Sequence, residues 1–294
     1  MLPHHLALML LVQLLWGVNF AVAKFGLDHF APIFFVALRF SLVAMLLVFV
    51  VGLPKLSMLK QLLPLSATMG VMHFTLIFLG MKNLDAATSS IAVQLQTPFA
   101  AIMAAFFFGE TLGWRRITGM IVAFAGVLLI AGEPRFSENP WPLMAVIAAA
   151  LVWAAGNIQV KALGDSVDAV QLNGWIAILA APQQLVASWL IEGPQWVHVP
   201  EVSWVGWVAL LFQAIVIAIF TYWIWYNMMR RYPVNQVMPF TLLLPAIGVA
   251  AGVLWRGEPL TWQMVVGGLA TIAGVGIIVL RRPAVVAPAT KTGI

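Results

Sequence analysis

Ten long apolar stretches run through the 294-residue chain, and no other feature constrains its fold as strongly. About 20 apolar residues form a helix that crosses the roughly 30 Å hydrocarbon core of a bilayer. Hydrophobic residues make up 63% of the chain and charged residues only 9%, whereas soluble domains carry about 25% charged residues. These proportions exclude a water-soluble enzyme, a nucleic-acid-binding protein and a disordered scaffold.

The apolar stretches follow one another closely. We expect an all-α polytopic membrane protein with ten transmembrane helices and no room for a domain outside the bilayer. The breaks between the stretches carry Gly, Pro and charged residues, as in Gly52-Leu53-Pro54-Lys55. The predicted spans are residues 5–25, 31–52, 62–81, 87–109, 115–132, 142–163, 169–191, 203–229, 234–255 and 262–280.

The basic residues predict the orientation of these spans. If the N-terminus is cytoplasmic, ten of the fifteen Lys and Arg residues lie in cytoplasmic loops and the tail, four lie outside, and Arg39 lies within a span. Loops rich in Lys and Arg stay in the cytoplasm. We therefore predict a multi-pass membrane protein with both termini cytoplasmic. The ten are Lys55, Lys60, Arg115, Arg116, Lys161, Arg230, Arg231, Arg281, Arg282 and Lys291.

The N-terminal stretch has an alternative interpretation as a signal peptide. Ala21-Val22-Ala23 follows an apolar run and resembles a signal-peptidase site. However, a signal peptide requires Lys or Arg before the apolar run, and none precedes it here. A first transmembrane helix is therefore favoured, and the internal repeat gives this stretch a second copy.

The sequence contains two copies of one pattern. Trp16 and Lys24 match Trp153 and Lys161 at an offset of 137 residues. Residues 109–114 match 257–262 at an offset of 148, and that register continues through Gly119/Gly267 and Ala125-Gly126-Val127/Ala273-Gly274-Val275. We expect two homologous units at residues 1–135 and 140–282, followed by a cytoplasmic tail at 283–294.

Each unit holds five spans. Because five is odd, the second unit must enter the membrane from the opposite face, which produces an inverted five-plus-five repeat. Inverted repeats are the architecture of secondary transporters, whose substrate site lies near the bilayer midplane between the halves. The repeat therefore indicates a transporter.

Several motifs make the chain similar to the EamA family of the drug/metabolite transporter superfamily. The motifs are Leu15-Trp16-Gly17-Val18-Asn19-Phe20, Leu38-Arg39-Phe40, Phe108-Gly109-Glu110, Trp153-Ala154-Ala155-Gly156-Asn157, and Leu243-Leu244-Pro245 with Gly257-Glu258-Pro259-Leu260. The resemblance implies ten helices, the inverted repeat, a place in the bacterial inner membrane, and export of amino acids or related metabolites such as O-acetylserine and cysteine. Within these motifs, Asn19 and Asn157 are candidate substrate-binding residues.

Ionisable residues within a bilayer are functional candidates by default. Those predicted within spans are Lys24, Arg39, His73 and Lys161, and no Asp or Glu lies at mid-span. Basic and amide groups suit a substrate with a carboxylate better than an organic cation. Arg39, Lys24 and Lys161 are candidates for gating or charge recognition, and His73 for substrate binding. The alternatives are snorkelling lysines, a structural contact for Arg39, and a neutral, hydrogen-bonded His73.

Amides and prolines supply further candidates. Gln94 and Gln96 in the fourth span are predicted to bind substrate, although such side chains also hydrogen-bond neighbouring membrane helices. Pro98 and Pro245 lie one position apart on the repeat alignment and each leaves a backbone carbonyl without its donor. We predict a hinge at both. Gly248 and Gly252 are predicted to allow close packing of the ninth helix.

Aromatic residues complete the predicted site. Trp16 and Trp153 lie near the centres of their spans, away from the membrane interfaces where Trp is common. Both are predicted to flank the substrate, with Lys24 and Lys161 near opposite mouths. Tyr222, with Trp223 and Trp225, forms a further predicted aromatic cluster in the eighth span.

The sequence favours an exporter of small amino-acid-like molecules working by alternating access, without a cofactor. No Gly-rich phosphate-binding loop is present to use ATP, and the chain has no cysteine for a thiolate metal site. An exporter of aromatic amino acids is the nearest alternative. A membrane-embedded lipid enzyme, a receptor and a channel are more remote, and the oligomeric state is left open, with a monomer included.

Overall fold

The structure is a computed structural model that describes residues 1–109, 112–133, 136, 138–163, 167–232 and 234–280. Within these residues the chain forms helices and no strand, and ten helical spans are long and apolar enough to cross a membrane. The predicted all-α fold with ten membrane-spanning helices is confirmed. The spans are Pro3–Leu27, Pro32–Val51, Leu56–Lys82, Ala86–Phe108, Trp114–Ala131, Trp141–Leu163, Ala169–Glu192, Trp204–Arg231, Met238–Arg256 and Trp262–Val279.

Most boundaries fall within two residues of the prediction. The third span begins at Leu56, six residues before the predicted start. The added turn contains Lys60, which the prediction placed in a cytoplasmic loop. A lysine near a helix end can lie along apolar surface and keep its ammonium in water, so the helix continues through it.

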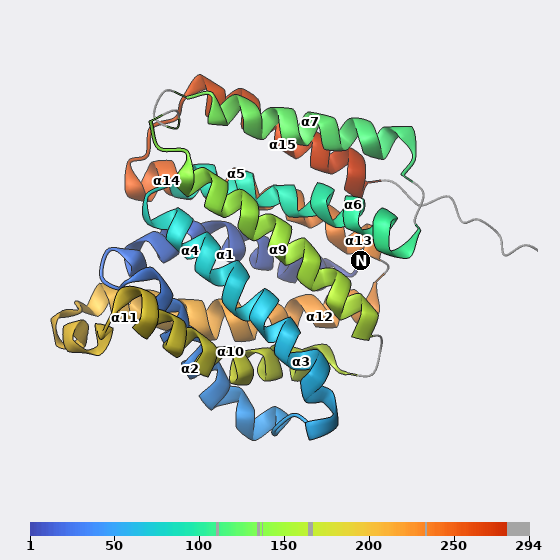
Figure 1. Ribbon diagram of the computed structural model, residues 1–294. Coiled ribbons are helices and arrows are strands. Elements are labelled where there is room, and N and C mark those ends of the chain that lie inside the picture. Colours follow the sequence, from blue (N-terminus) through green and yellow to red (C-terminus); the bar gives the residue numbers. More distant parts are fainter. Residues whose placement is uncertain (110–111, 134–135, 137, 164–166, 233, 281–294) are drawn as a thin grey trace, which may run out of the picture.

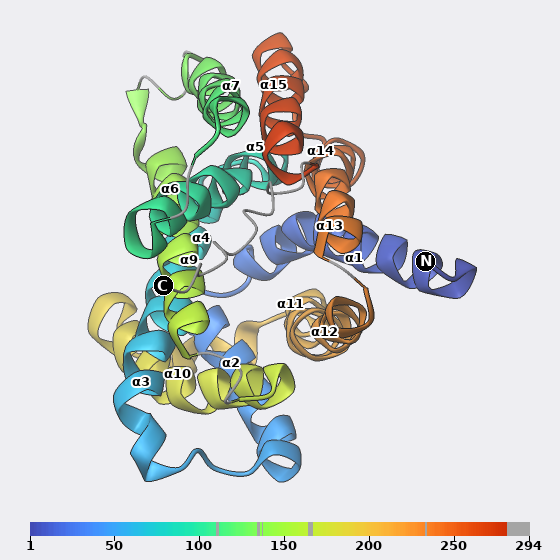
Figure 2. The ribbon, with the colours of Figure 1, turned by 90° about the vertical axis from the view of Figure 1, so that its right-hand side faces the viewer.

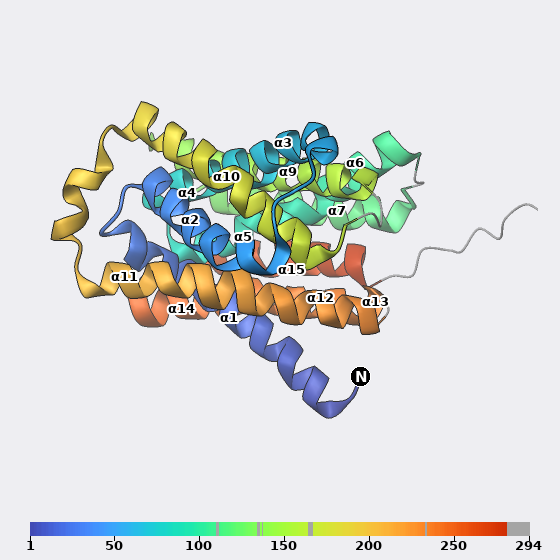
Figure 3. The same ribbon diagram turned by 90° about the horizontal axis from the view of Figure 1, so that it is seen from below.

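Six spans are single α-helices, namely α1 (Pro3–Leu27), α2 (Pro32–Val51), α7 (Trp114–Ala131), α9 (Trp141–Leu163), α10 (Ala169–Glu192) and α15 (Trp262–Val279). The other four are interrupted. A π-helical segment, Ser66–Met72, joins α3 (Leu59–Leu65) to α4 (His73–Lys82), and another, Phe212–Thr221, joins α11 (Trp204–Leu211) to α12 (Tyr222–Arg231). Figure 3 shows α11 and α12 as one long rod.

The remaining two spans contain short 3-10 segments. Val93–Leu95 separates α5 (Ala86–Ala92) from α6 (Gln96–Phe108), and Met238–Leu242 separates α13 (Val234–Val237) from α14 (Leu243–Arg256). The π segments therefore fall in the third and eighth spans, and the 3-10 segments in the fourth and ninth. These are equivalent positions in two halves of five spans, as the repeat requires.

The packing of α7 against α15 gives the clearest view of the repeat (Figure 1). A Cβ added to Gly126 would lie 2.4 Å from the Gly267 carbonyl oxygen, and one added to Gly119 would lie 2.7 Å from that of Gly274. These are the glycines that the sequence repeat aligns, and each faces the partner's other glycine. Two equivalent helices thus cross antiparallel, as an inverted repeat demands.

Close packing also joins α14 to α5. A Cβ on Gly248 would lie 2.4 Å from the Cβ of Ser90, and one on Gly252 would lie 2.2 Å from a carboxylate oxygen of Glu258. The prediction that these glycines allow close packing is confirmed. Membrane helices have no hydrophobic driving force for association, and small residues at the contact allow close van der Waals packing instead.

The helix ends lie at two faces of the molecule. We define the terminal face as the one where α1 begins and α15 ends, and the opposite face as the one where α1 ends and α15 begins. Figure 2 views the bundle from the side of the terminal face. A line of contacts identifies the opposite face, because the ends of α1, α4, α10 and α14 meet the starts of α2, α5 and α11 there.

Candidate substrate cavity

A cavity of about 820 Å³ lies between the two halves of the molecule. Its lining comes from both halves and is largely apolar and aromatic, with a few polar groups. Drug-sized and smaller ligands bind in concave sites of this volume and character. All eight predicted substrate-binding residues line it, namely Trp16, Asn19, His73, Gln94, Gln96, Trp153, Asn157 and Tyr222.

The interrupted helices position two of these residues. His73 and Tyr222 each begin the α-helix that follows a π segment, and each lies nine residues before the end of its span. π-helical turns frequently occur at functional sites. Because the two spans run in opposite directions, His73 and Tyr222 enter the cavity from opposite sides of the membrane midplane.

Each of these two side chains packs against a tryptophan of the other half. The ring centroids of Trp16 and Tyr222 are 5.5 Å apart, and those of Trp153 and His73 are 4.7 Å apart. Trp16 also donates its indole N–H to Thr221 Oγ1 at 2.6 Å. The cavity wall is therefore built from two equivalent aromatic pairs, and each pair crosses the boundary between the halves.

The predicted aromatic cluster of the eighth span is divided by the helix. Tyr222 lines the cavity and Trp225 packs against Trp16, with centroids 5.0 Å apart. Trp223 instead lies 55% exposed on the outside of the bundle. The inclusion of Trp223 was wrong, because consecutive helical positions differ in direction by about 100° and cannot share one face.

His73 has a defined hydrogen bond. Its Nδ1 lies 2.9 Å from the Ala149 carbonyl oxygen, and a carbonyl only accepts. Nδ1 therefore carries the proton, and Nε2 of the neutral ring is an acceptor. The sequence had left open a neutral His73 that is hydrogen-bonded to a neighbouring helix, and this hydrogen bond is present. His73 also lines the cavity.

The two prolines lie outside the described cavity lining, immediately after the 3-10 segments. Pro98 and Pro245 are each the third residue of their helix and are buried. Pro245 cannot donate to the carbonyl of Thr241 four residues earlier. The Gln94 amide donates to that carbonyl at 3.3 Å, which links the two interrupted helices. A hinge role for the prolines stays a prediction.

Arg39 lies within the cavity wall and is 4% exposed. It is the eighth residue of α2, roughly 10 Å from the opposite-face end of that helix. Its guanidinium carbon lies 4.4 Å from the ring centroid of Phe74 and 5.7 Å from that of Phe40. Among the described residues it forms no ion pair, and its Nε has no hydrogen-bond partner.

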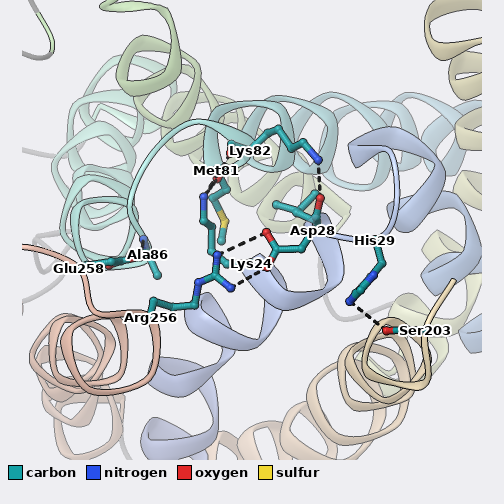
Figure 4. A network of polar contacts seen from close by, with 10 residues as sticks. Lys24, Asp28, His29, Met81, Lys82, Ala86, Ser203, Arg256 and Glu258 are labelled. Carbon is teal, nitrogen blue, oxygen red and sulfur yellow. Dashed lines mark hydrogen bonds and ion pairs between the residues drawn. The ribbon is translucent and has the colours of Figure 1, made fainter.

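Polar contacts close the opposite face (Figure 4). Lys24 Nζ donates to the Met81 and Lys82 carbonyls at 2.9 and 3.2 Å, and Lys82 Nζ donates to the Leu27 carbonyl at 2.5 Å. Arg256 pairs with Asp28 at 2.6 Å. These contacts tie the end of α1 to the ends of α4 and α14, at the deep end of the cavity, which Ala23 and Met81 line.

Two glutamates close the same face by capping helices. Glu258 accepts from the backbone N–H groups of Ala86 and Ala87 at 2.7 and 2.9 Å, at the start of α5. Glu192 accepts from those of Ile33 and Phe34, both at 2.8 Å, at the start of α2. The first N–H groups of a helix have no partner within it, and they favour negative charge. Glu110, the repeat equivalent of Glu258, lies outside the described residues.

The cavity extends to the terminal face. Its lining includes Arg116 at the start of α7, Leu163 at the end of α9, and Val279 at the end of α15. Lys24 and Lys161 are not among the described lining residues. Lys161 lies in the last turn of α9 with its Nζ 4.0 Å from the Phe108 ring centroid. The two lysines lie near opposite faces, as predicted, and their gating role stays a prediction.

Sequence reasoning missed Phe74, Asn173 and the capping role of Glu258. Phe74 follows His73, and its ring forms the cation–π contact with Arg39. Asn173 lines the cavity and donates to the Ala218 carbonyl at 2.8 Å. The repeated Gly-Glu motif was a visible signal for Glu258. No local pattern marks Phe74, because one phenylalanine among many apolar residues carries no positional information.

Comparison with known proteins gives the same architecture. The model of the EamA-like transporter family matches residues 5–132 and again residues 140–280. The chain belongs to the EamA-like transporter family. It is therefore a multi-pass membrane transporter of a small molecule rather than an enzyme.

Relatives of the chain carry the names of transporters. The chain is 32% identical to the "Probable amino-acid metabolite efflux pump" of Salmonella typhimurium over 280 residues, 92% of this chain and 93% of the relative. It is 24% identical to the "Probable terminal-alkyne amino-acid exporter" of Streptantibioticus cattleyicolor, covering 92% and 91%. One protein of known crystal structure matches with a TM-score of 0.63 over 93% of this chain and 96% of its own, and at 17% identity this likeness concerns the fold alone.

Proposed function

We propose that this EamA-like transporter exports amino acids and related metabolites, of the O-acetylserine and cysteine type, by alternating access. The observation that carries the proposal is the cavity itself, which is built from both halves, with a described lining that extends to helix ends at the terminal face and with polar contacts across its other end. Inverted-repeat transporters bind substrate near the midplane and rock one half against the other around that site.

The conformation fits one state of such a cycle. The described lining extends to helix ends at the terminal face, whereas hydrogen bonds and an ion pair join the helix ends at the opposite face. The distribution of Lys and Arg favours the terminal face as cytoplasmic. On this assignment the cavity is open to the cytoplasm of a bacterial inner membrane and closed to the outside, ready to load cargo for export.

The chemistry of the cavity supports a substrate of amino-acid type. The described lining contains Arg39, Arg116 at the terminal-face end, neutral amides and aromatic rings, and no Asp or Glu. The two relatives above are named for amino-acid cargo, which supports the same substrate class. The aromatic pairs around Trp16 and Trp153 also favour aromatic amino acids as a second candidate cargo.

Counterflow tests the proposal. Proteoliposomes containing the purified protein are loaded with O-acetylserine, cysteine, leucine or phenylalanine, and uptake of the labelled compound is followed. We expect saturable uptake that depends on the internal load for at least one of these four. Uptake that rises linearly with concentration for every compound would indicate a channel, and no uptake of any of them would refute amino-acid transport.

A further inference from the structure

Arg39 places a positive charge inside the membrane. It is 4% exposed, and the described part of the chain gives it no ion pair and no hydrogen bond to Nε. An uncompensated charge at this depth is costly, and such residues pair or serve a function. The Phe74 ring, 4.4 Å away, compensates part of that cost through a cation–π contact.

The fold itself does not require a cation at this place. The offset of 137 that relates Trp16 to Trp153 also relates the start of α2, Pro32, to the start of α10, Ala169. The equivalent of Arg39 is then Ile176, which lines the same cavity from the other half. The two aromatic pairs are symmetric, whereas Arg39 breaks the symmetry. A residue present in only one half is better explained by the ligand than by the architecture.

The cavity offers nothing of opposite charge to a ligand's ammonium group. Its described lining contains no Asp or Glu. Apart from Arg116 at the terminal-face end, the other polar groups of that lining are neutral, and they include acceptors such as His73 Nε2. A planar guanidinium matches the geometry of a carboxylate, with which it can form two parallel hydrogen bonds. The described lining therefore offers a charged partner to a carboxylate and none to an ammonium group.

We propose that Arg39 anchors the carboxylate of the substrate, and that the site accepts carboxylates whether or not they carry an amino group. This rests on the proposed function in taking the cavity as the transport site. A 2-oxo acid or an N-acylated amino acid neutralises Arg39 and brings no second positive charge. An amino-acid amide or an amine adds a positive charge beside an unpaired one. Carboxylic acids lacking a free amine are thus substrates as well.

Two matched ligand series test this on the purified full-length protein. The first comprises leucine, 4-methyl-2-oxopentanoate, N-acetylleucine, leucinamide and 3-methylbutylamine, and the second comprises the corresponding compounds of phenylalanine. Binding is measured by thermal shift in detergent, and transport by competition in counterflow. We expect the 2-oxo and N-acetyl acids to bind at least as tightly as the parent amino acid, and the amide and amine about 10- to 100-fold more weakly.

Variants separate binding from structure. Arg39→Gln should weaken binding of every carboxylate about 10- to 100-fold and bring acids and amides to similar affinities, and Arg39→Lys should lie between it and the parent. The exposed Lys60 on the terminal face supplies a charge-matched control, Lys60→Gln, with parental affinities. Without ligand, Arg39→Gln should melt at the parental temperature or higher, because an uncompensated buried charge is removed.

The outcomes distinguish the two proposals. If amides compete as well as 2-oxo acids while leucine or phenylalanine is transported, the role of Arg39 is refuted and the proposed function stands. A lower melting temperature of ligand-free Arg39→Gln with an unchanged acid-to-amide ratio also refutes it and makes Arg39 structural. If carboxylates bind and no amino acid is transported, the anchor stands and the proposed function fails. If no compound binds, both are refuted.

Discussion

Replacing Glu258 by glutamine should open the face that the structure holds closed. Glu258 is 9% exposed, and its carboxylate accepts from two consecutive N–H groups of α5, at 2.7 and 2.9 Å. The carboxamide keeps one acceptor oxygen and turns its NH₂ toward the second N–H group. The variant therefore loses one charge-assisted hydrogen bond, weakens the other and leaves a buried donor unpaired.

These losses set the expected magnitude. A hydrogen bond to a charged group contributes about 1.5–3 kcal/mol, so we expect the closed state to lose about 2–3 kcal/mol. At 1.4 kcal/mol per tenfold change, the ratio of open to closed protein rises about 30- to 150-fold. The Asp28–Arg256 pair on the same face is a weaker contact, because Asp28 is 46% exposed and such pairs contribute about 0–1 kcal/mol. Asp28→Asn should change the ratio at most about fivefold.

A cysteine placed in the cavity reports the opening. The chain has no native cysteine, and Ala23 lines the deep end of the cavity at 1% exposure. In intact cells, an impermeant maleimide should label Ala23→Cys much faster when Glu258→Gln is also present. Asp28→Asn is the matched control, and membrane abundance of each variant is followed in parallel. Equal labelling rates in the presence and absence of Glu258→Gln, or a larger effect of Asp28→Asn, would refute the reasoning.

Three further predictions concern the cavity, the packing and the orientation. Trp153→Ala removes the ring that packs on His73 and should weaken substrate binding about 2- to 10-fold in thermal-shift titrations, whereas Trp223→Ala, on the outside of the bundle, should leave it unchanged. Gly126→Ala forces a Cβ to within 2.4 Å of a carbonyl oxygen and should destabilise the protein by about 1–3 kcal/mol, seen as a lower melting temperature in detergent. A cysteine at Gln195 should react with an impermeant maleimide in intact cells, and one at Lys60 should react only after lysis; the reverse result would invert the topology.

The sequence determined most of the fold. Each apolar stretch is long enough to satisfy its backbone as a helix across the bilayer, and the chain has no other way to satisfy those groups in lipid. The glycine register shared by residues 109–127 and 257–275 predicted the inverted repeat, and the same glycines form the crossing of α7 and α15. The span boundaries needed little correction, because the polar breaks between spans are sharp.

The sequence also indicated which side chains deserved attention, since polar and aromatic groups at mid-span are rare and costly. It could not say which of them face one another. A membrane helix is apolar toward both lipid and protein, so its pattern carries little contrast between inside and outside. The error at Trp223, exposed beside the cavity-lining Tyr222, follows from this lack of contrast.

Only the tertiary structure decided the pairings and the state of the cavity. Trp16 meets Tyr222 and Trp153 meets His73 across 206 and 80 residues of chain, where no local rule applies. The π segments that precede His73 and Tyr222 leave no signature in composition. Likewise, Glu258 could be recognised as part of a repeated motif, but its role as a cap on α5 depends on a helix start 172 residues away. Arg39 is conspicuous in the sequence as a charge within a span. Its lack of an ion pair among the described residues, however, depends on packing, because folding decides which potential counter-ions come within reach.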